Sequence, residues 1–350
     1  MNNIKSVIII VLTLSISSTS FCKNIYATDF FHIDIITNDA TKTKLEQIEK
    51  IKIKSLISIL DKILTTEYMN YLIKKNQHQK YLGSLVQNII IENELITNEK
   101  YIADIKINFN KKDIIYFLRN SKLNYTDIYS EPILVLSSYN KEFITYGLSE
   151  KNIFYDIDKL ILEFENELLD IKIPDLNPND RFIISYKNII NNDISSLSTI
   201  ANKYNVNDIL IINIKKINND ELNIKVDHYS NQTAKVLFVG VFNLYDPNEL
   251  HSNIISNLGD WWKKNHLIDN NIINLVTCSI NSHNYSDLID IKDKIENLSQ
   301  FKSIKTMSIS YNNNIEKIEF YGDYSIFAES LLLNNIEIIT NDKCSIRTIQ

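Results

Sequence analysis

The hydrophobic pattern changes period several times in the first part of the chain, which predicts alternating strands and helices. The expected elements are a strand at 30–36, a helix with apolar positions from 45 to 64, strands at 89–96 and 101–109, a helix from Asp113 to Leu118, and an apolar strand at 133–136. Strand, helix, two strands, helix and strand is the split βαβ order. We therefore expect an N-terminal α+β module over 28–140.

The middle of the chain, 141–268, reads as a second α+β module. Asp193 is placed to cap a helix that carries Leu197 and Ile200. Three strands follow closely, and Pro247 stands where a further helix begins. These strands are expected at 208–217, 222–229 and 234–244.

The last part, 269–350, repeats the βαββαβ order with clear periodicity. The expected elements are strands at 272–280, 304–310 and 315–321, helices at 287–298 and 324–333, and a final strand or hairpin from Ile336. This order predicts a ferredoxin-like module. The fold class is therefore α+β, with two or three small modules on mixed or antiparallel sheets, and with N- and C-terminal modules of split βαβ type.

The first 27 residues have the pattern of a signal peptide. Lys5 precedes an apolar run over 7–14, and small polar residues follow it. Cleavage is expected after Ala27, with Ser20 as the alternative position. If the segment is not cleaved, residues 6–21 are an inner-membrane anchor. No later segment has the ~18 uninterrupted apolar residues that a membrane span needs.

The charge of the chain argues against nucleic acid as a partner. Removing residues 1–27 takes away Lys5 and Lys23 and no acidic residue, so the formal charge falls from −6 to −8. No basic stripe with interleaved aromatic residues is present. We expect a soluble mature part in the periplasm, with contact to a membrane only through an uncleaved N-terminal segment.

Cys278 and Cys344 are the two cysteines that remain after the predicted signal peptide. In an oxidising compartment they are candidates for a disulfide. Their separation in the sequence does not decide the matter. A ferredoxin-like module would place its first and last strands side by side, and would bring these two residues within reach of each other.

Catalytic and cofactor-binding motifs are missing from the sequence. It contains no nucleophile elbow, zinc-protease motif, Walker loop or dinucleotide fingerprint, and its five glycines cannot form a phosphate-binding loop. The six histidines lack the spacing of a metal site. The loop from Asp175 to Asp180 is rich in carboxylates and amides, but it lacks the spaced ligands and the glycine of a calcium loop. We expect no catalytic residue, cofactor or metal.

Several soft motifs together resemble the domain-of-unknown-function 2066 family of exported proteobacterial proteins. They lie at 101–109, 132–136, 197–210 and 320–323, in addition to the signal peptide and the long N-terminal helix. Aromatic residues such as Phe143 and Phe154 stand where the family tends to carry tryptophan. The resemblance implies an envelope location and an α+β fold, and it brings no catalytic residues.

These observations predict an exported envelope protein that acts as a non-enzymatic binding or assembly module. Its expected partners are other envelope proteins. Two alternatives remain open: a periplasmic hydrolase with a site at the Asp175–Asp180 loop, and an accessory subunit that is anchored in the inner membrane.

Overall fold

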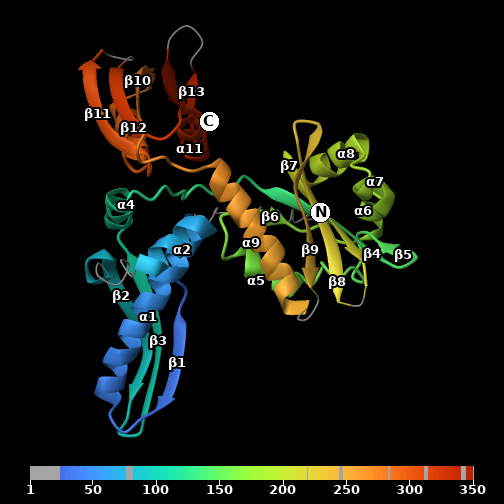
Figure 1. Cartoon of the computed structure of the whole chain (residues 1–350). Coiled ribbons are helices and arrows are strands. Elements are labelled where there is room, and N and C mark those ends of the chain that lie inside the picture. Colours follow the sequence, from blue (N-terminus) through green and yellow to red (C-terminus); the bar gives the residue numbers. More distant parts are fainter. Residues whose placement is uncertain are drawn as a thin grey trace, which may run out of the picture.

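The computed structural model describes residues 24–75, 82–218, 220–243, 247–282, 284–310, 314–339 and 344–349. Within them the chain is an α+β protein with a three-, a six- and a five-stranded sheet. Figure 1 shows the three sheets as separate units, with helices packed on each. The predicted α+β class, with several modules on antiparallel or mixed sheets, is confirmed.

The N-terminal module is a three-stranded antiparallel sheet with a long helix on one face. Its elements are β1 (Phe31–Ile36), α1 (Ala40–Ile63), α2 (Thr66–Lys75), β2 (Val86–Ile96), β3 (Lys100–Phe109) and α4 (Lys111–Asn120). The strand order is β1-β3-β2. Every second side chain of β3 is buried, because α1 packs against that face of the sheet. α1 begins after Asp39, whose carboxylate accepts the N–H of Lys42.

The strand predicted at 133–136 belongs to the central sheet, so its assignment to the N-terminal module is wrong. β1 and β2 flank β3 in the split βαβ manner, but the fourth strand, β4 (Ile133–Lys141), pairs in parallel with β7 (Asp208–Lys216). The first seven residues of β4 are all buried. Such a strand needs cover on both faces, which the central sheet provides. The module boundary expected at residue 140 therefore lies before residue 133.

The central module is a mixed sheet in the order β5-β4-β7-β8-β9, with β6 also paired to β4. Its other elements are β5 (Ile144–Tyr146), α5 (Ile157–Phe164), β6 (Ile171–Lys172), α6 (Pro178–Ile183), α7 (Tyr186–Ile190), α8 (Ile194–Tyr204), β8 (Glu221–Ser230), β9 (Thr233–Asn243) and α9 (Pro247–Asn265). The three consecutive strands predicted over 208–244 are confirmed as β7, β8 and β9. Asp193 caps α8 by accepting the N–H of Ser196, as predicted.

Helices cover both faces of the central sheet. Neighbouring residues of a strand point to opposite faces, and β8 shows this at Asp227 and His228. Asp227 accepts a hydrogen bond from Asn192, between α7 and α8. His228 contacts the ring of Trp261 on α9, with ring centroids 5.0 Å apart. The short helices therefore lie on one face and α9 on the other.

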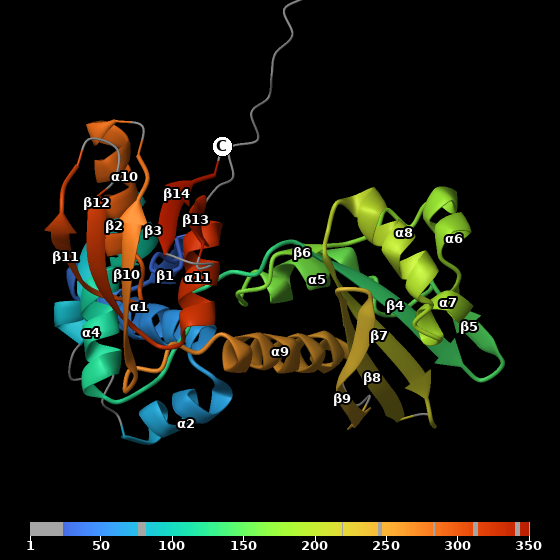
Figure 2. The same ribbon diagram turned by 90° about the horizontal axis from the view of Figure 1, so that it is seen from above.

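α9 connects the central sheet to the rest of the molecule, as Figure 2 shows. The indole N–H of Trp262 donates to the backbone oxygen of Ile128 at 2.8 Å. Nζ of Lys263 donates to the backbone oxygen of Asp61 at the end of α1, also at 2.8 Å. The N-terminal and central modules share one hydrophobic core, whereas the C-terminal module has its own. Close packing at α9 uses a glycine, because a Cβ at Gly259 would overlap the carboxylate of Glu167.

The C-terminal module is a five-stranded sheet in the order β11-β12-β10-β14-β13. Its elements are β10 (Ile273–Ile280), α10 (Tyr285–Glu296), β11 (Phe301–Ser308), β12 (Asn314–Tyr321), α11 (Tyr324–Leu333), β13 (Ile336–Ile339) and β14 (Ser345–Thr348). The first three strands follow the ferredoxin-like order. The chain end adds a hairpin, and β14 inserts between β10 and β13 with a parallel pairing to β10. This pairing brings Cys344 beside Cys278 in a disulfide, with a Cα–Cα distance of 4.4 Å.

None of the described helices is both long enough and apolar enough to cross a bilayer.

Candidate functional site

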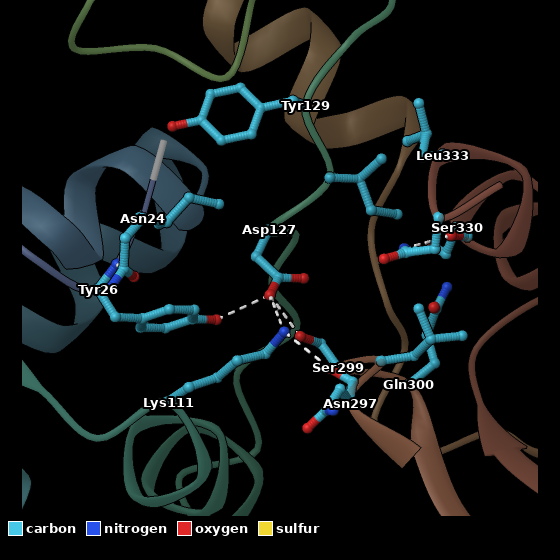
Figure 3. A pocket seen from close by; sticks show the side chains of 14 residues that line it. Asn24, Tyr26, Lys111, Asp127, Tyr129, Asn297, Ser299, Gln300, Ser330 and Leu333 are labelled. Carbon is cyan, nitrogen blue, oxygen red and sulfur yellow. Dashed lines mark hydrogen bonds and ion pairs between the residues drawn. The ribbon is translucent and has the colours of Figure 1, made fainter. Parts of the chain in front are cut away.

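Four segments from distant parts of the sequence enclose a cavity of about 350 Å³ between the N- and C-terminal modules. They are residues 24–26 ahead of β1, the connection 127–129 between α4 and β4, residues 297–300 just before β11, and residues 330–334 at the end of α11. Lys111 of α4 also lines the cavity. We call this cavity the Asp127 cleft (Figure 3). It lies where the chain passes from one module to the next.

The carboxylate of Asp127 is the centre of the polar contacts in the cleft. Its Oδ2 accepts hydrogen bonds from the hydroxyls of Tyr26, at 2.9 Å, and of Ser299. Nζ of Lys111 forms an ion pair with the same oxygen at 3.2 Å. The Asp127 side chain is only 8% exposed. One oxygen therefore joins the N-terminal segment, α4 and the C-terminal module.

Burial and the carboxylate together change the chemistry of Tyr26. Loss of solvent raises the pKa of its phenol well above the ordinary value, and the charge of Asp127 raises it further. The phenol is therefore a neutral hydrogen-bond donor over the whole physiological range. Its role is to hold the carboxylate in place.

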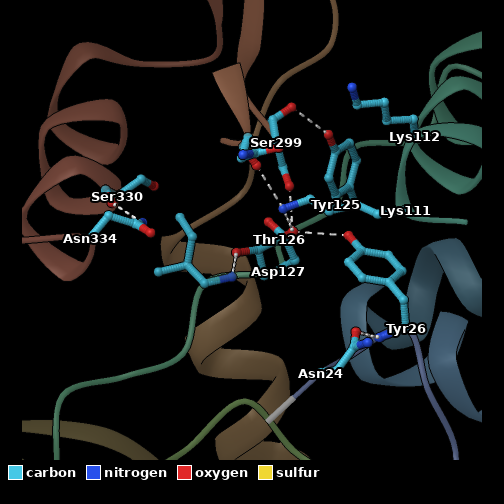
Figure 4. Close-up of polar contacts among 12 residues, drawn as sticks. Asn24, Tyr26, Lys111, Lys112, Tyr125, Thr126, Asp127, Ser299, Ser330 and Asn334 are labelled. Atoms are coloured by element: carbon cyan, nitrogen blue, oxygen red, sulfur yellow. Dashed lines mark hydrogen bonds and ion pairs between the residues drawn. The ribbon is translucent and has the colours of Figure 1, made fainter. Parts of the chain in front are cut away.

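A second set of bonds fixes the C-terminal module through its backbone, as Figure 4 shows in part. The carbonyl oxygen of Ser299 accepts from Nη2 of Arg119 at 2.7 Å and from the hydroxyl of Tyr125 at 3.0 Å. Nζ of Lys111 also donates to the carbonyl oxygen of Asn297, at 3.1 Å. The guanidinium of Arg119 lies 3.9 Å from the ring centre of Tyr321. These contacts orient the residues that line the cleft.

Two polar atoms of the cleft are left over from this network. Gln300 is 1% exposed, and its Nε2 meets no acceptor within the described part of the chain. Asp127 uses Oδ2 for all three contacts given above, and Figure 3 shows its other oxygen turned toward the side of the cavity where Gln300 lies. A buried donor and an acceptor thus line one cavity. Together they match the C=O and N–H groups of an amide.

The residues singled out in the sequence lie elsewhere or have structural roles. Cys278 and Cys344 tie β10 to the segment before β14, inside the C-terminal module. Ala27 forms a β-bridge with Asn108. Ile25 and Tyr26, just before it, are buried in the main core. A cut after Ala27 would remove these two residues from that core, and the cleavage position stays a prediction.

The Asp175–Asp180 segment leads from β6 into the first turn of α6 in the central module. Asn177 caps α6 by accepting the N–H of Asp180 at 2.9 Å. Asp180 is fully buried, and its carboxylate accepts hydrogen bonds from Lys203 and from the hydroxyl of Tyr204. The latter hydroxyl also accepts the N–H of Asp175 at 2.8 Å. The loop is therefore part of the contact between α6 and α8. Neither Asp175 nor Asp180 lines the Asp127 cleft.

Sequence reasoning missed every polar residue of the cleft. Tyr26 fell inside the predicted signal peptide, and Asp127 is a single carboxylate with no motif around it. Its partners Tyr26 and Ser299 are 101 and 172 positions away in the chain. Only the spatial arrangement of the modules brings these residues together.

Over the described ranges, no group of three or more histidine, cysteine, aspartate or glutamate side chains is arranged to hold an ion. Comparisons with models of protein families, with curated proteins and with solved structures returned no match for this chain.

Proposed function

We propose that this chain is an exported protein of the bacterial envelope that acts by binding, and that the Asp127 cleft receives a polypeptide segment of another envelope protein. Export rests on the N-terminal sequence, with its lysine and its apolar run. The volume of the cleft is at the lower end of the ~300–1,000 Å³ that ligand sites occupy. The resemblance to the domain-of-unknown-function 2066 family stays a prediction.

The observation that carries the proposal is the buried amide of Gln300. A buried N–H without an acceptor costs about 1–3 kcal/mol. A carbonyl oxygen of a bound peptide recovers that energy once the Gln300 side chain, part of the cleft lining, turns its amide toward the cavity. Oδ1 of Asp127 then accepts an N–H of the same peptide. Asparagine side chains at the rim of the cleft, from Asn24, Asn297 and Asn334, add further neutral groups that suit a peptide backbone.

The contacts of Asp127 favour binding over catalysis. Three donors hold its Oδ2, so the carboxylate positions the modules. Asp127 is also the one carboxylate among the residues that line the cleft, whereas hydrolysis by general acid–base catalysis commonly employs a pair of titrating groups. Asp180, in the loop on which the hydrolase alternative rests, is engaged with Lys203 and Tyr204, which supports binding over hydrolysis.

The contacts of Tyr26 in the cleft also bear on where we propose that the mature protein begins. Tyr26 donates to Asp127, and its backbone oxygen accepts the N–H of Phe109 at 2.8 Å. Of the two cleavage positions, only the one after Ser20 keeps Tyr26. N-terminal sequencing after cell fractionation tests this: we expect a start at Phe21 in the periplasmic fraction. A start at Thr28 would contradict the proposed cleft, and an intact N-terminus in the membrane fraction would favour the anchored alternative.

Cross-linking from the cleft tests the binding role. A photoreactive amino acid at Asn334 is activated in intact cells, and we expect a cross-link to a defined envelope protein. Gln300→Met removes the buried donor and is expected to weaken this partner's binding about five- to tenfold. Gln47→Met, on α1 outside the cleft, is the matched control. Equal cross-linking in both variants, or turnover of a substrate that depends on Asp127, would overturn the proposal.

A further inference from the structure

A second cavity, of about 250 Å³, is lined by Ser130 and Glu131, further along the connection between α4 and β4. α9 and the ends of the inner strands β4, β7 and β8 form one wall, and α11 of the C-terminal module forms the other. Its lining includes both tryptophans of the chain, Trp261 and Trp262. We call it the tryptophan pocket. It shares only Leu333 with the Asp127 cleft.

Apart from two histidines, the ionisable side chains that line the tryptophan pocket are all acidic. Three carboxylates line it, from Glu131, Asp208 and Glu329, and its lining includes no lysine or arginine. The Asp208 and Glu329 side chains are 25% and 35% exposed, so a ligand can reach them. The carboxylates come from three different parts of the chain: the connection before β4, β7 and α11. A cation is the ligand whose charge complements this wall.

Two histidines hold two of these carboxylates in position. Nε2 of His228 lies 2.9 Å from Oδ1 of Asp208, and Nε2 of His266 lies 3.3 Å from Oε1 of Glu329. His266 also stacks on Trp262 with a centroid distance of 3.5 Å. Asp227, which precedes His228 in β8, points to the other face of the sheet and takes no part.

The indole rings give the pocket an aromatic wall. Trp262 is fixed, because it is buried and its N–H donates to Ile128. Trp261 is partly buried, and it contacts His228 and Trp262 with its ring. An indole face in a partly desolvated site attracts a cation by about 0.5–2 kcal/mol. Aromatic and acidic walls in one cavity are the combination that binds organic cations.

From this combination we infer that the tryptophan pocket binds an alkylammonium group. An ammonium has three donors that diverge, which suits carboxylates from three elements better than the planar fork of a guanidinium does. The alkyl chain packs on the aliphatic part of the lining, at Ile133, Leu332 and Leu333. The group comes either from a lysine side chain of a protein partner or from a free aliphatic amine.

Intrinsic fluorescence reports on the pocket directly, because its two tryptophans are the only ones in the chain. The mature protein is titrated at low salt with Nα-acetyl-lysine methylamide, with n-butylamine, and with the neutral analogue Nα-acetyl-norleucine methylamide. We expect a saturable change in emission with the two amines and none with the analogue. Tighter binding of the lysine derivative identifies a protein partner as the source, and equal or tighter binding of butylamine identifies a free amine. An equal response to the norleucine derivative, or no response to either amine, would overturn the inference.

Variants that each remove one negative charge show where the amine binds. Glu329→Gln and Glu131→Gln each remove one carboxylate from the wall and are expected to weaken binding about two- to fivefold. Glu150→Gln makes the same change of net charge at an exposed position outside the pocket, and its affinity should equal that of the parent. Circular dichroism checks that all three variants fold. Identical losses in all three would show that the amine is attracted only by the net charge, and the pocket would then be excluded.

Discussion

The bond between Tyr26 and Asp127 provides the sharpest test of the cleft. Tyr26→Phe removes one hydroxyl and leaves the ring in place. In the parent the hydroxyl donates to Oδ2 of Asp127 at 2.9 Å, and Tyr26 is 5% exposed. No other described segment is altered by the substitution, so the change in stability measures this contact.

The size of the effect follows from the partners that remain. A hydrogen bond to a charged group contributes about 1.5–3 kcal/mol. Lys111 and Ser299 still bind the same oxygen after the substitution. Most of the free-energy cost of burying the charged carboxylate is therefore still offset. We therefore expect a loss at the lower end, about 1.5 kcal/mol. With an m-value of about 3 kcal/mol/M, the urea midpoint falls by about 0.5 M.

Urea unfolding followed by tryptophan fluorescence is the assay. Trp262 lies in the hydrophobic core that also contains Tyr26, so the signal reports the part of the molecule that is perturbed. Tyr116→Phe is the control, because Tyr116 is 67% exposed and its loss should change the stability by less than about 0.5 kcal/mol. A double-mutant cycle with Asp127→Asn isolates the pair. An unchanged midpoint in Tyr26→Phe, at an unchanged m-value, would refute the role given to this bond.

Three further predictions concern other parts of the molecule. Cys278→Ser is expected to destabilise the C-terminal module by about 2–4 kcal/mol, measured by thermal unfolding; a mature chain that begins at Phe21 also keeps Cys22, so three reactive thiols in the denatured parent, in place of one, would show that the bridge is not formed. Folding raises the pKa of the buried Tyr26, Tyr125 and Tyr155, chiefly through desolvation. Their protons are therefore lost first from the unfolded chain, so the stability is retained below about pH 10 and falls at higher pH by about 1.4 kcal/mol per pH unit for each tyrosine. Urea midpoints from pH 8 to 11 check this, and a flat profile would contradict it. Gly259→Ala places a Cβ against Glu167; we expect overpacking of about 1–3 kcal/mol to outweigh the ~1 kcal/mol gain in helix propensity, and a higher melting temperature would show that Glu167 moves aside.

Local patterns in the sequence predicted the elements better than their partners. The apolar run at 133–136 was identified as a buried strand, and β4 is buried along its first seven residues. Nothing in the run tells which sheet it joins, because burial on two faces is the same signal in either module. The hairpin β13–β14 illustrates the same point, since its pairing with β10 depends on a contact across the module.

The tryptophans show a second limit of periodicity. Along α9 the stripe of Leu250, Ile254 and Leu258 continues to Trp261, which predicts that Trp261 is the more buried of the pair. In the structure Trp262 is the buried one, and Trp261 is partly exposed in a cavity. The helix leaves the central sheet near its C-terminal end and contacts the other modules there. Its buried side changes at that point, and a single periodicity cannot describe both contacts.

The cleft could not be predicted, because its residues carry no common motif. Tyr26, Asp127 and Ser299 acquire their roles only when three segments meet. The sequence pattern reports burial within an element, whereas this site depends on the packing between elements.

Tyr26 and Ser299 both donate to the carboxylate of Asp127, and this has a consequence for how the chain folds. Ser299 is synthesised about 270 residues after Tyr26, which at about 5–20 residues per second is a delay of roughly 15–55 s. During that delay the growing chain holds the Tyr26 hydroxyl and the Asp127 carboxylate without their last partner. Contacts of such sequence separation form late and slowly. The cleft is therefore among the final parts of the molecule to be assembled, and the nascent chain depends on protection from aggregation until its C-terminal module has emerged.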